Sequence, residues 1–176
     1  LTTTHAAVND APAIANPTTT IAEDATKTFS ATAGTAATEW GYSDTESVAL
    51  SHVKIITLPG DGSLALGGVA VSVNDEIALA SLNTLVYTPL LNDNGVGADT
   101  FTFQVKDANS YSSTGTMSFT ITAVNDVPVA GDTTDQTAYE DLAFSFSTTA
   151  STDVDGDSMT IACVETGSDM PGWISE

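Results

Sequence analysis

The chain is a succession of short segments in which apolar and polar residues alternate, and no long segment has the 3.6-residue period of an amphipathic helix. The clearest alternation is "DTFTFQV", where Phe101, Phe103 and Val105 fall on one face of an extended strand. Only "DEIALASLN" at 75–83 has room for a helical turn. We expect strands, rich in β-branched and aromatic residues, within 48–59, 63–73, 83–89, 99–105 and 116–124.

Turn signals separate these segments. "PGDGS" at 59–63 and "NDNG" at 92–95 place glycine, proline and asparagine where neighbouring strands must reverse direction. Short alternating strands between such turns predict an all-β fold in which two sheets pack face to face as a sandwich.

An internal repeat is the strongest sign of domain organisation. "AVNDAP" near the start returns as "AVNDVP", so that Asp10 and Asp126 lie 126 − 10 = 116 residues apart. With one inserted residue the match continues and pairs Glu23 with Glu140. A period of this size is one β domain, which predicts tandem repeats. The expected parts are the last strand of a preceding repeat at 1–8, a complete domain at 9–126, and the truncated start of a second domain at 127–176.

The charge balance limits the partners. The chain has 23 Asp and Glu against three Lys and no Arg, a net charge of −20. Nucleic acids and anionic membranes need cationic side chains for phosphate contacts, so neither nucleic-acid binding nor membrane insertion is expected. Excess carboxylate keeps a protein soluble, and it also suits divalent cations, so the clustering of the acids decides between these interpretations.

The densest acidic cluster is "DVDGD", in which Asp153, Asp155 and Asp157 alternate along the chain. Two carboxylates about 5 Å apart repel by roughly 3 kcal/mol at an effective dielectric near 20. Calcium relieves such repulsion because it takes six to eight oxygen ligands. An EF-hand loop is excluded, since Ser158 replaces its glycine and Val164 its final glutamate.

Other chemistry has little support. His5 and His52 lie far apart without cysteine nearby, so no zinc ligand set exists, and no serine is marked as a nucleophile. We therefore expect a protein that is not an enzyme. His52 and Cys163 are interpreted as structural residues, and Trp40 and Trp173 as core residues in preference to a sugar-stacking surface.

Several motifs resemble one family. "VNDAP" and "VNDVP" resemble the linker between cadherin-type domains, and "IAED" resembles the glutamate motif that follows this linker. "SDTES" and "DVDGD" are similar to the family's paired-acid motif, and "QVKDANSYSS" to its late aspartate motif. Almost all of 8–126 is similar to the bacterial cadherin-like and Ig-like repeats of giant RTX-type adhesins. The second copy, with "DVDGDSMTI" and "MPGWIS", is closer to the dystroglycan-type branch.

The resemblance implies an Ig/cadherin-like β-sandwich and a cofactor, Ca²⁺, bound between neighbouring repeats of the same chain. Its ligands come from the end of one domain, from the linker and from the top of the next. The upstream junction then uses Asn9, Asp10, Asp44, Glu46 and Asp107. The downstream junction uses Glu23, one of Asp93 and Asp99, and then Asn125, Asp126, Asp153, Asp155 and Asp157. Glu140 serves a third junction.

The expected function is that of a calcium-rigidified extender in a secreted protein of the bacterial cell surface, supporting adhesion or biofilm attachment. The alternative is a self-assembling extracellular filament or surface-layer subunit, in which residues 1–8 complete the sheet of another copy. A carbohydrate- or protein-binding module is a third possibility with less support in the sequence.

Overall fold

The computed structural model describes residues 8–131 and 149–160. The chain divides into two compact units, Leu1–Val124 and Asn125–Glu176, and each is described by itself. The predicted strand at 1–8, Glu140, Cys163 and Trp173 lie largely or wholly outside the described residues, and the predicted domain limits and tandem repeats stay predictions.

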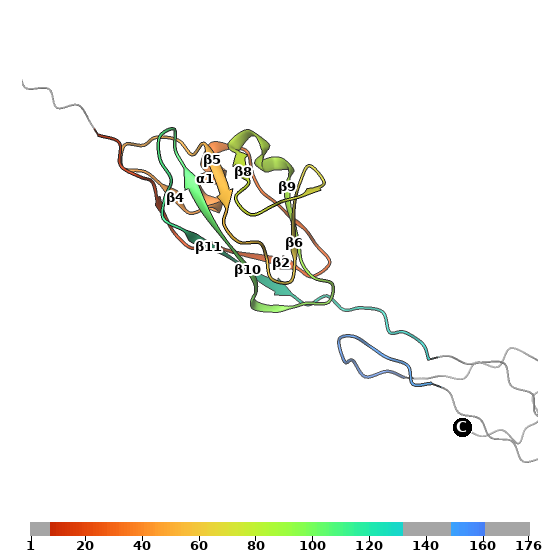
Figure 1. Ribbon diagram of the computed structural model, residues 1–176. Helices are drawn as coiled ribbons and strands as arrows, with labels where there is room; N and C mark the ends of the chain where they lie inside the picture. The colour runs from red at the N-terminus through yellow and green to blue at the C-terminus, as the bar shows by residue number, and fades with distance from the viewer. Residues whose placement is uncertain (1–7, 132–148, 161–176) are drawn as a thin grey trace, which may run out of the picture. The chain divides into compact units, whose positions relative to one another are not determined.

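The first unit is a β-sandwich, which confirms the all-β prediction (Figure 1). One sheet has five strands, in the spatial order β2 (Thr18–Ala22), β11 (Gly115–Thr122), β10 (Gly95–Lys106), β5 (His52–Ile55) and β8 (Glu76–Ala78). The other has four, in the order β3 (Lys27–Thr28), β9 (Leu85–Thr88), β6 (Ser63–Leu66) and β7 (Val69–Ala70). A separate pair consists of β1 (Ala13–Ile14) and β4 (Tyr42–Ser43). All pairs are antiparallel except β2 with β11, which are parallel.

The core follows the alternation seen in the sequence. β10 buries Phe101, Phe103 and Val105, as predicted, and β11 buries alternate residues in the same way. Trp40 is fully buried between the sheets, with its ring 4.6 Å from the Phe29 ring and 4.8 Å from the Phe103 ring. The prediction that Trp40 is a core residue is confirmed.

Two short helices complete the sandwich. The segment 75–83 contains the expected helical turn as a 3-10 helix, η1 (Leu79–Thr84), directly after strand β8. The prediction that no other segment is helical is wrong, because α1 (Ala33–Glu39) forms in "AGTAATE". Its alanines have high helix propensity, and Ala36 anchors the helix in the core. Gly41, at φ +61°, follows the helix in a conformation that favours glycine.

Candidate functional site

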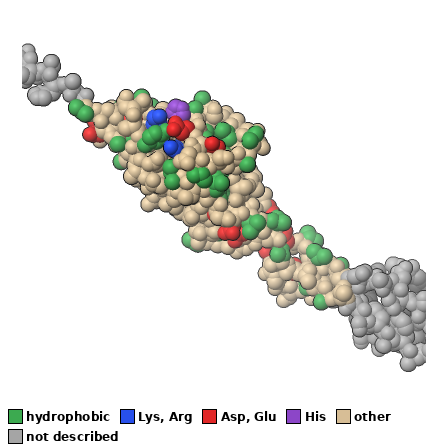
Figure 2. Space-filling view, viewed as in Figure 1, with side chains coloured by type: hydrophobic (Ala, Val, Ile, Leu, Met, Phe, Trp, Pro, Cys, Tyr) green, Lys and Arg blue, Asp and Glu red, His purple; other side chains and the backbone are tan. Residues whose placement is uncertain are grey.

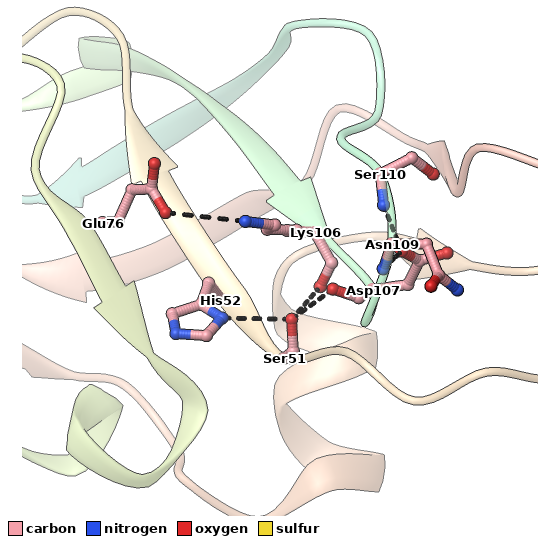
Figure 3. Close-up of polar contacts among 7 residues, drawn as sticks. All are labelled: Ser51, His52, Glu76, Lys106, Asp107, Asn109 and Ser110. Carbon is pink, nitrogen blue, oxygen red and sulfur yellow. Dashed lines mark hydrogen bonds and ion pairs between the residues drawn. The ribbon is translucent and has the colours of Figure 1, made fainter.

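Asp107 is the most firmly held of the predicted ligands. It follows the last residue of β10 and is fully buried. Its Oδ1 accepts the backbone N–H groups of Asn109 and Ser110, each at 2.6 Å, and the Ser51 hydroxyl donates to its backbone carbonyl (Figure 3). The Ser110 N–H, followed by that of Asn109, holds the pKa of the Asp107 carboxyl below its ordinary value.

The upstream linker lies against this aspartate. Asn9 Nδ2 donates to Asp107 Oδ2 at 3.1 Å, and Asn109 Nδ2 donates to Asn9 Oδ1 at 2.8 Å. The next residue, Asp10, donates its backbone N–H to Glu46 Oε2 at 3.2 Å. The structure therefore brings together four of the five predicted upstream ligands, from three distant parts of the chain.

Asp44 is the fifth. Its Oδ1 accepts the Val48 N–H at 2.8 Å, whereas its Oδ2 is buried and has no hydrogen-bond partner among the described residues. Burial, then the charges of Asp44 and Asp107, raise the pKa of Tyr42 to about 12, so both carboxylates act on the same hydroxyl. An orphaned buried carboxylate oxygen is costly, and a cation beside it would remove that cost.

The carboxylates of Asp44, Glu46 and Asp107 do not converge on a single position. Within the described part of the sandwich, no three acidic side chains bring one oxygen each within 4.8 Å of one another. An ion would have to draw Asp44, Glu46 and Asp107 inward, or use Asn9 and backbone oxygens beside two of them.

At the other end of the sandwich, the predicted downstream ligand Glu23 is buried and Asp93 is half-buried. Glu23 is 4% exposed, its Oε1 accepts the backbone N–H of Val124, and its own N–H donates to Thr122 O at 3.0 Å. Asp93 has a buried Oδ2 without a hydrogen-bond partner among the described residues. Glu23 thus fixes the segment that leaves β11.

Asp99 has a structural role, because its carboxylate accepts hydrogen bonds from a turn and from a core side chain. Its Oδ1 accepts the N–H groups of Gly60 and Thr100 at 2.8 and 2.7 Å, and its Oδ2 accepts Gly62 N–H and the Tyr87 hydroxyl at 2.8 and 2.9 Å. Burial, and then the bond to Asp99, raise the pKa of the Tyr87 hydroxyl above its ordinary value. These four bonds satisfy both oxygens without an ion, so of the two downstream alternatives the geometry favours Asp93.

The second unit gathers its own predicted ligands. The Asp126 N–H donates to Asp155 Oδ2 at 2.7 Å, and Asp153 Oδ1 accepts the N–H groups of Asp155 and Asp157 at 3.0 and 3.2 Å. The Asn125 amide donates to the Asp126 carbonyl at 2.9 Å. The "DVDGD" loop is therefore folded around Asp153, as carboxylates commonly fold short loops. Metal binding by these residues stays a prediction.

Sequence reasoning missed one polar cluster, on the outer face of β5, β8 and β10. Lys106 lies 3.8 Å from the Glu76 carboxylate, and Lys106 and Lys54 lie 4.7 and 5.5 Å from the centre of the Tyr111 ring. His52, opposite Lys106 in the sheet, is half-buried and bonded to the Ser51 hydroxyl. Figure 2 shows Lys and His side chains together on this face. Because these side chains contact one another across neighbouring strands, we interpret the cluster as one that stabilises the sheet.

Two facing sheets around a single aromatic core, with polar residues gathered at the strand ends, define an Ig-like sandwich. Residues 9–120 match the family model described as Bacterial Ig domain, and the chain belongs to this family. Comparison with curated proteins and with solved structures finds no match. Domains of this family are typically non-enzymatic structural modules, commonly of surface or extracellular proteins. No helix among the described residues is long and apolar enough to span a membrane.

Proposed function

We propose that the chain is an extender segment of a secreted bacterial adhesin, stiffened by calcium at the ends of its sandwich. The observation that carries this proposal is the seating of the upstream linker. Asn9 is bonded to Asp107 across 98 residues of sequence, and Asp10 to Glu46. A linker that is tied to acidic side chains of the sandwich is placed to respond to any ion that those side chains bind.

The donor set fits a hard cation. Asn9, Asp10, Asp44, Glu46 and Asp107 offer carboxylate and amide oxygens, which are the ligands that calcium prefers. Asp44 Oδ2 already lies buried without a partner among the described residues. These residues would hold the ion, and the ion would supply positive charge beside their carboxylates.

The physical effect of the ion is a change in stiffness. Without it, neighbouring carboxylates repel one another by about 3 kcal/mol per pair at 5 Å and an effective dielectric near 20. With it, the linker and the sandwich share ligands, so that the linker loses its freedom to swing. Extracellular modules bind calcium with Kd on the order of 10⁻⁴–10⁻³ M, which matches a site whose side chains must first turn inward. A stiff series of such domains would carry an adhesive region away from the cell, in support of adhesion or biofilm attachment.

Calorimetric titration with calcium tests the upstream site. We expect binding by the unmodified chain and a loss of about tenfold or more in affinity in Asp44→Asn, because a ligand oxygen and a charge are both removed. Asp61→Asn is the matched control, since Asp61 is an exposed acid in a turn and its replacement removes the same charge. Equal affinities in the two variants would contradict the assignment.

Small-angle scattering tests the mechanical part. The maximum dimension of the chain should increase when calcium is added and fall back to its starting value when a chelator is added. We expect this change in the unmodified chain and in Asp61→Asn, and not in Asp44→Asn. Identical scattering with and without calcium would refute calcium stiffening, even where calorimetry shows that calcium binds.

A further inference from the structure

The loop that leads into β10 contains an Asn-Gly pair, Asn94–Gly95, the one such pair in the sequence. Asn94 and Gly95 are both exposed, and the following Val96 is 92% exposed. No hydrogen bond among the described residues holds the Asn94 side chain. The amide is therefore free to turn toward the backbone of the next residue.

Gly95 is the right neighbour for such a turn. It has φ +138°, a conformation in which other residues are strained, and a Cβ added to it would meet nothing within 4 Å. Gly95 is the first residue of β10 and pairs with Ile121, whereas Asn94 lies before the strand. Because Gly95 has no side chain, nothing of its own hinders the approach of the Asn94 side chain to its backbone nitrogen. The pair thus combines an exposed Asn94 side chain with a following residue that does not hinder the attack sterically.

We propose that Asn94 is a site of spontaneous deamidation. The Gly95 nitrogen attacks Asn94 Cγ, the new C–N bond closes a five-membered succinimide ring, and the Cγ–Nδ2 bond breaks. The amide nitrogen leaves as ammonia with the proton from the Gly95 nitrogen. Water then opens the ring at either carbonyl and yields aspartate or isoaspartate, so water is the one co-reactant and no redox step occurs.

Comparable pairs in the chain are protected. Asp61–Gly62 can close the same ring by loss of water, but the Gly62 N–H donates to Asp99 at 2.8 Å. A Cβ at Gly62 would lie 2.7 Å from Thr88 O, so that this turn has no room to rotate. Asn92 shares the loop with Asn94 and is followed by Asp93, whose side chain crowds the attacking nitrogen. In a second Asp-Gly pair, Asp155–Gly156, the Gly156 N–H donates to Asp153 O at 3.3 Å. Asn94 is therefore the one asparagine in the sequence that is followed by glycine, and its deamidation, unlike ring closure at an aspartate, adds a charge.

Deamidation of Asn94 adds a negative charge close to Asp93, one of the predicted metal ligands. A new carboxylate appears one residue from Asp93, and Gly95 pairs with Ile121 near the end of β11. The isoaspartate form also adds a methylene to the backbone just before β10. Any consequence for calcium rests on the function proposed above, whereas the modification itself does not.

The test is incubation of the whole chain at mildly alkaline and mildly acidic pH, followed by isoelectric focusing, peptide mass mapping and labelling by an isoaspartyl methyltransferase. We expect a shift of one negative charge, faster at alkaline pH because the attacking nitrogen must lose its proton. The label should map to the peptide that contains residue 94, be lost in Asn94→Gln, and be unchanged in Asn92→Gln. No charge shift, or an equal shift in Asn94→Gln, would overturn the proposal.

These readouts separate the two proposals. A chain that binds no calcium and still acquires the label at residue 94 overturns the proposed function and leaves the modification site standing. A chain that binds calcium and keeps Asn94 intact overturns the modification alone.

Discussion

Asp99 offers the sharpest test of the fold, through the replacement Asp99→Asn. The substitution keeps the shape of the side chain and exchanges one acceptor oxygen for an amide group. The best arrangement leaves the carbonyl oxygen facing Gly60 and Thr100, and turns the amide toward Gly62 N–H and the Tyr87 hydroxyl. The hydroxyl can rotate to accept, whereas the Gly62 N–H cannot and loses its partner.

The expected cost follows from these bonds. One buried N–H without an acceptor costs about 1–3 kcal/mol, and the loss of charge weakens the bonds that remain by about 1 kcal/mol in total. We therefore expect Asp99→Asn to lower the free energy of unfolding by about 3 kcal/mol. Tyr87→Phe removes one bond to the charged carboxylate and keeps the ring stacked on Phe119 at 3.7 Å, so we expect a loss of about 2 kcal/mol.

A double-mutant cycle measured by urea unfolding provides the assay. Because the two side chains share one bond, the double variant should lose less than the sum of the single losses, by about 1 kcal/mol. The dependence of the free energy on urea should stay constant across the set. Asp61→Asn, in the turn that Asp99 holds, should stay within about 0.5 kcal/mol of the unmodified chain.

Two results would refute the reasoning. A loss below about 0.5 kcal/mol in Asp99→Asn would mean that the four bonds do not hold the turn. Strict additivity of the two losses would mean that the Tyr87 hydroxyl and Asp99 do not interact. In a folded Asp99→Asn chain, calcium affinity should be unchanged, because Asp93 and not Asp99 has the orphaned oxygen.

Two further predictions concern α1 and the upstream end. Gly34→Ala should raise the free energy of unfolding by about 0.5–1 kcal/mol, since Gly34 is helical and an added Cβ meets nothing within 4 Å; a lower urea midpoint would contradict this. The pKa of Tyr42 is raised to about 12, so the folded chain holds this proton more tightly than the unfolded chain, and stability should fall as pH rises from 10 to 12. Tyr42→Phe should flatten that fall in unfolding curves measured across this range, and an unchanged slope would contradict the assignment.

The sequence predicted the parts of the fold in which local pattern and packing agree. Buried and less buried residues alternate over eight residues in both β10 and β11, so the sequence pattern shows which face of each strand is buried. β1, β3 and β4 have two residues each, too few to show any period. α1 was missed because its seven residues expose most of their surface and bury Ala36 alone. Its position depends on Trp40, which only the tertiary structure brings into the core.

The candidate site shows the same division. The linker motif and the late aspartate motif identified Asn9 and Asp107, and the structure joins them by a hydrogen bond. Sequence reasoning missed the structural role of Asp99 because three of its four hydrogen-bond partners lie 12 to 39 residues away. Two of them, Gly60 and Gly62, lie in a turn that has the sequence of an ordinary exposed loop. The signal that was available is the second glycine of "PGDGS", Gly62, since only a residue without a side chain fits against Tyr87 there.

The parallel pairing of β2 with β11 has a consequence for a chain under tension. β2 begins near the point where the chain enters the sandwich, and β11 ends near the point where the chain leaves it. Opposite pulls on those two points run along the strands and across their hydrogen bonds, from Thr18–Ser118 to Ala22–Thr122. Force therefore shears the five residue pairs together instead of opening them one after another, so the sandwich resists stretching before it yields.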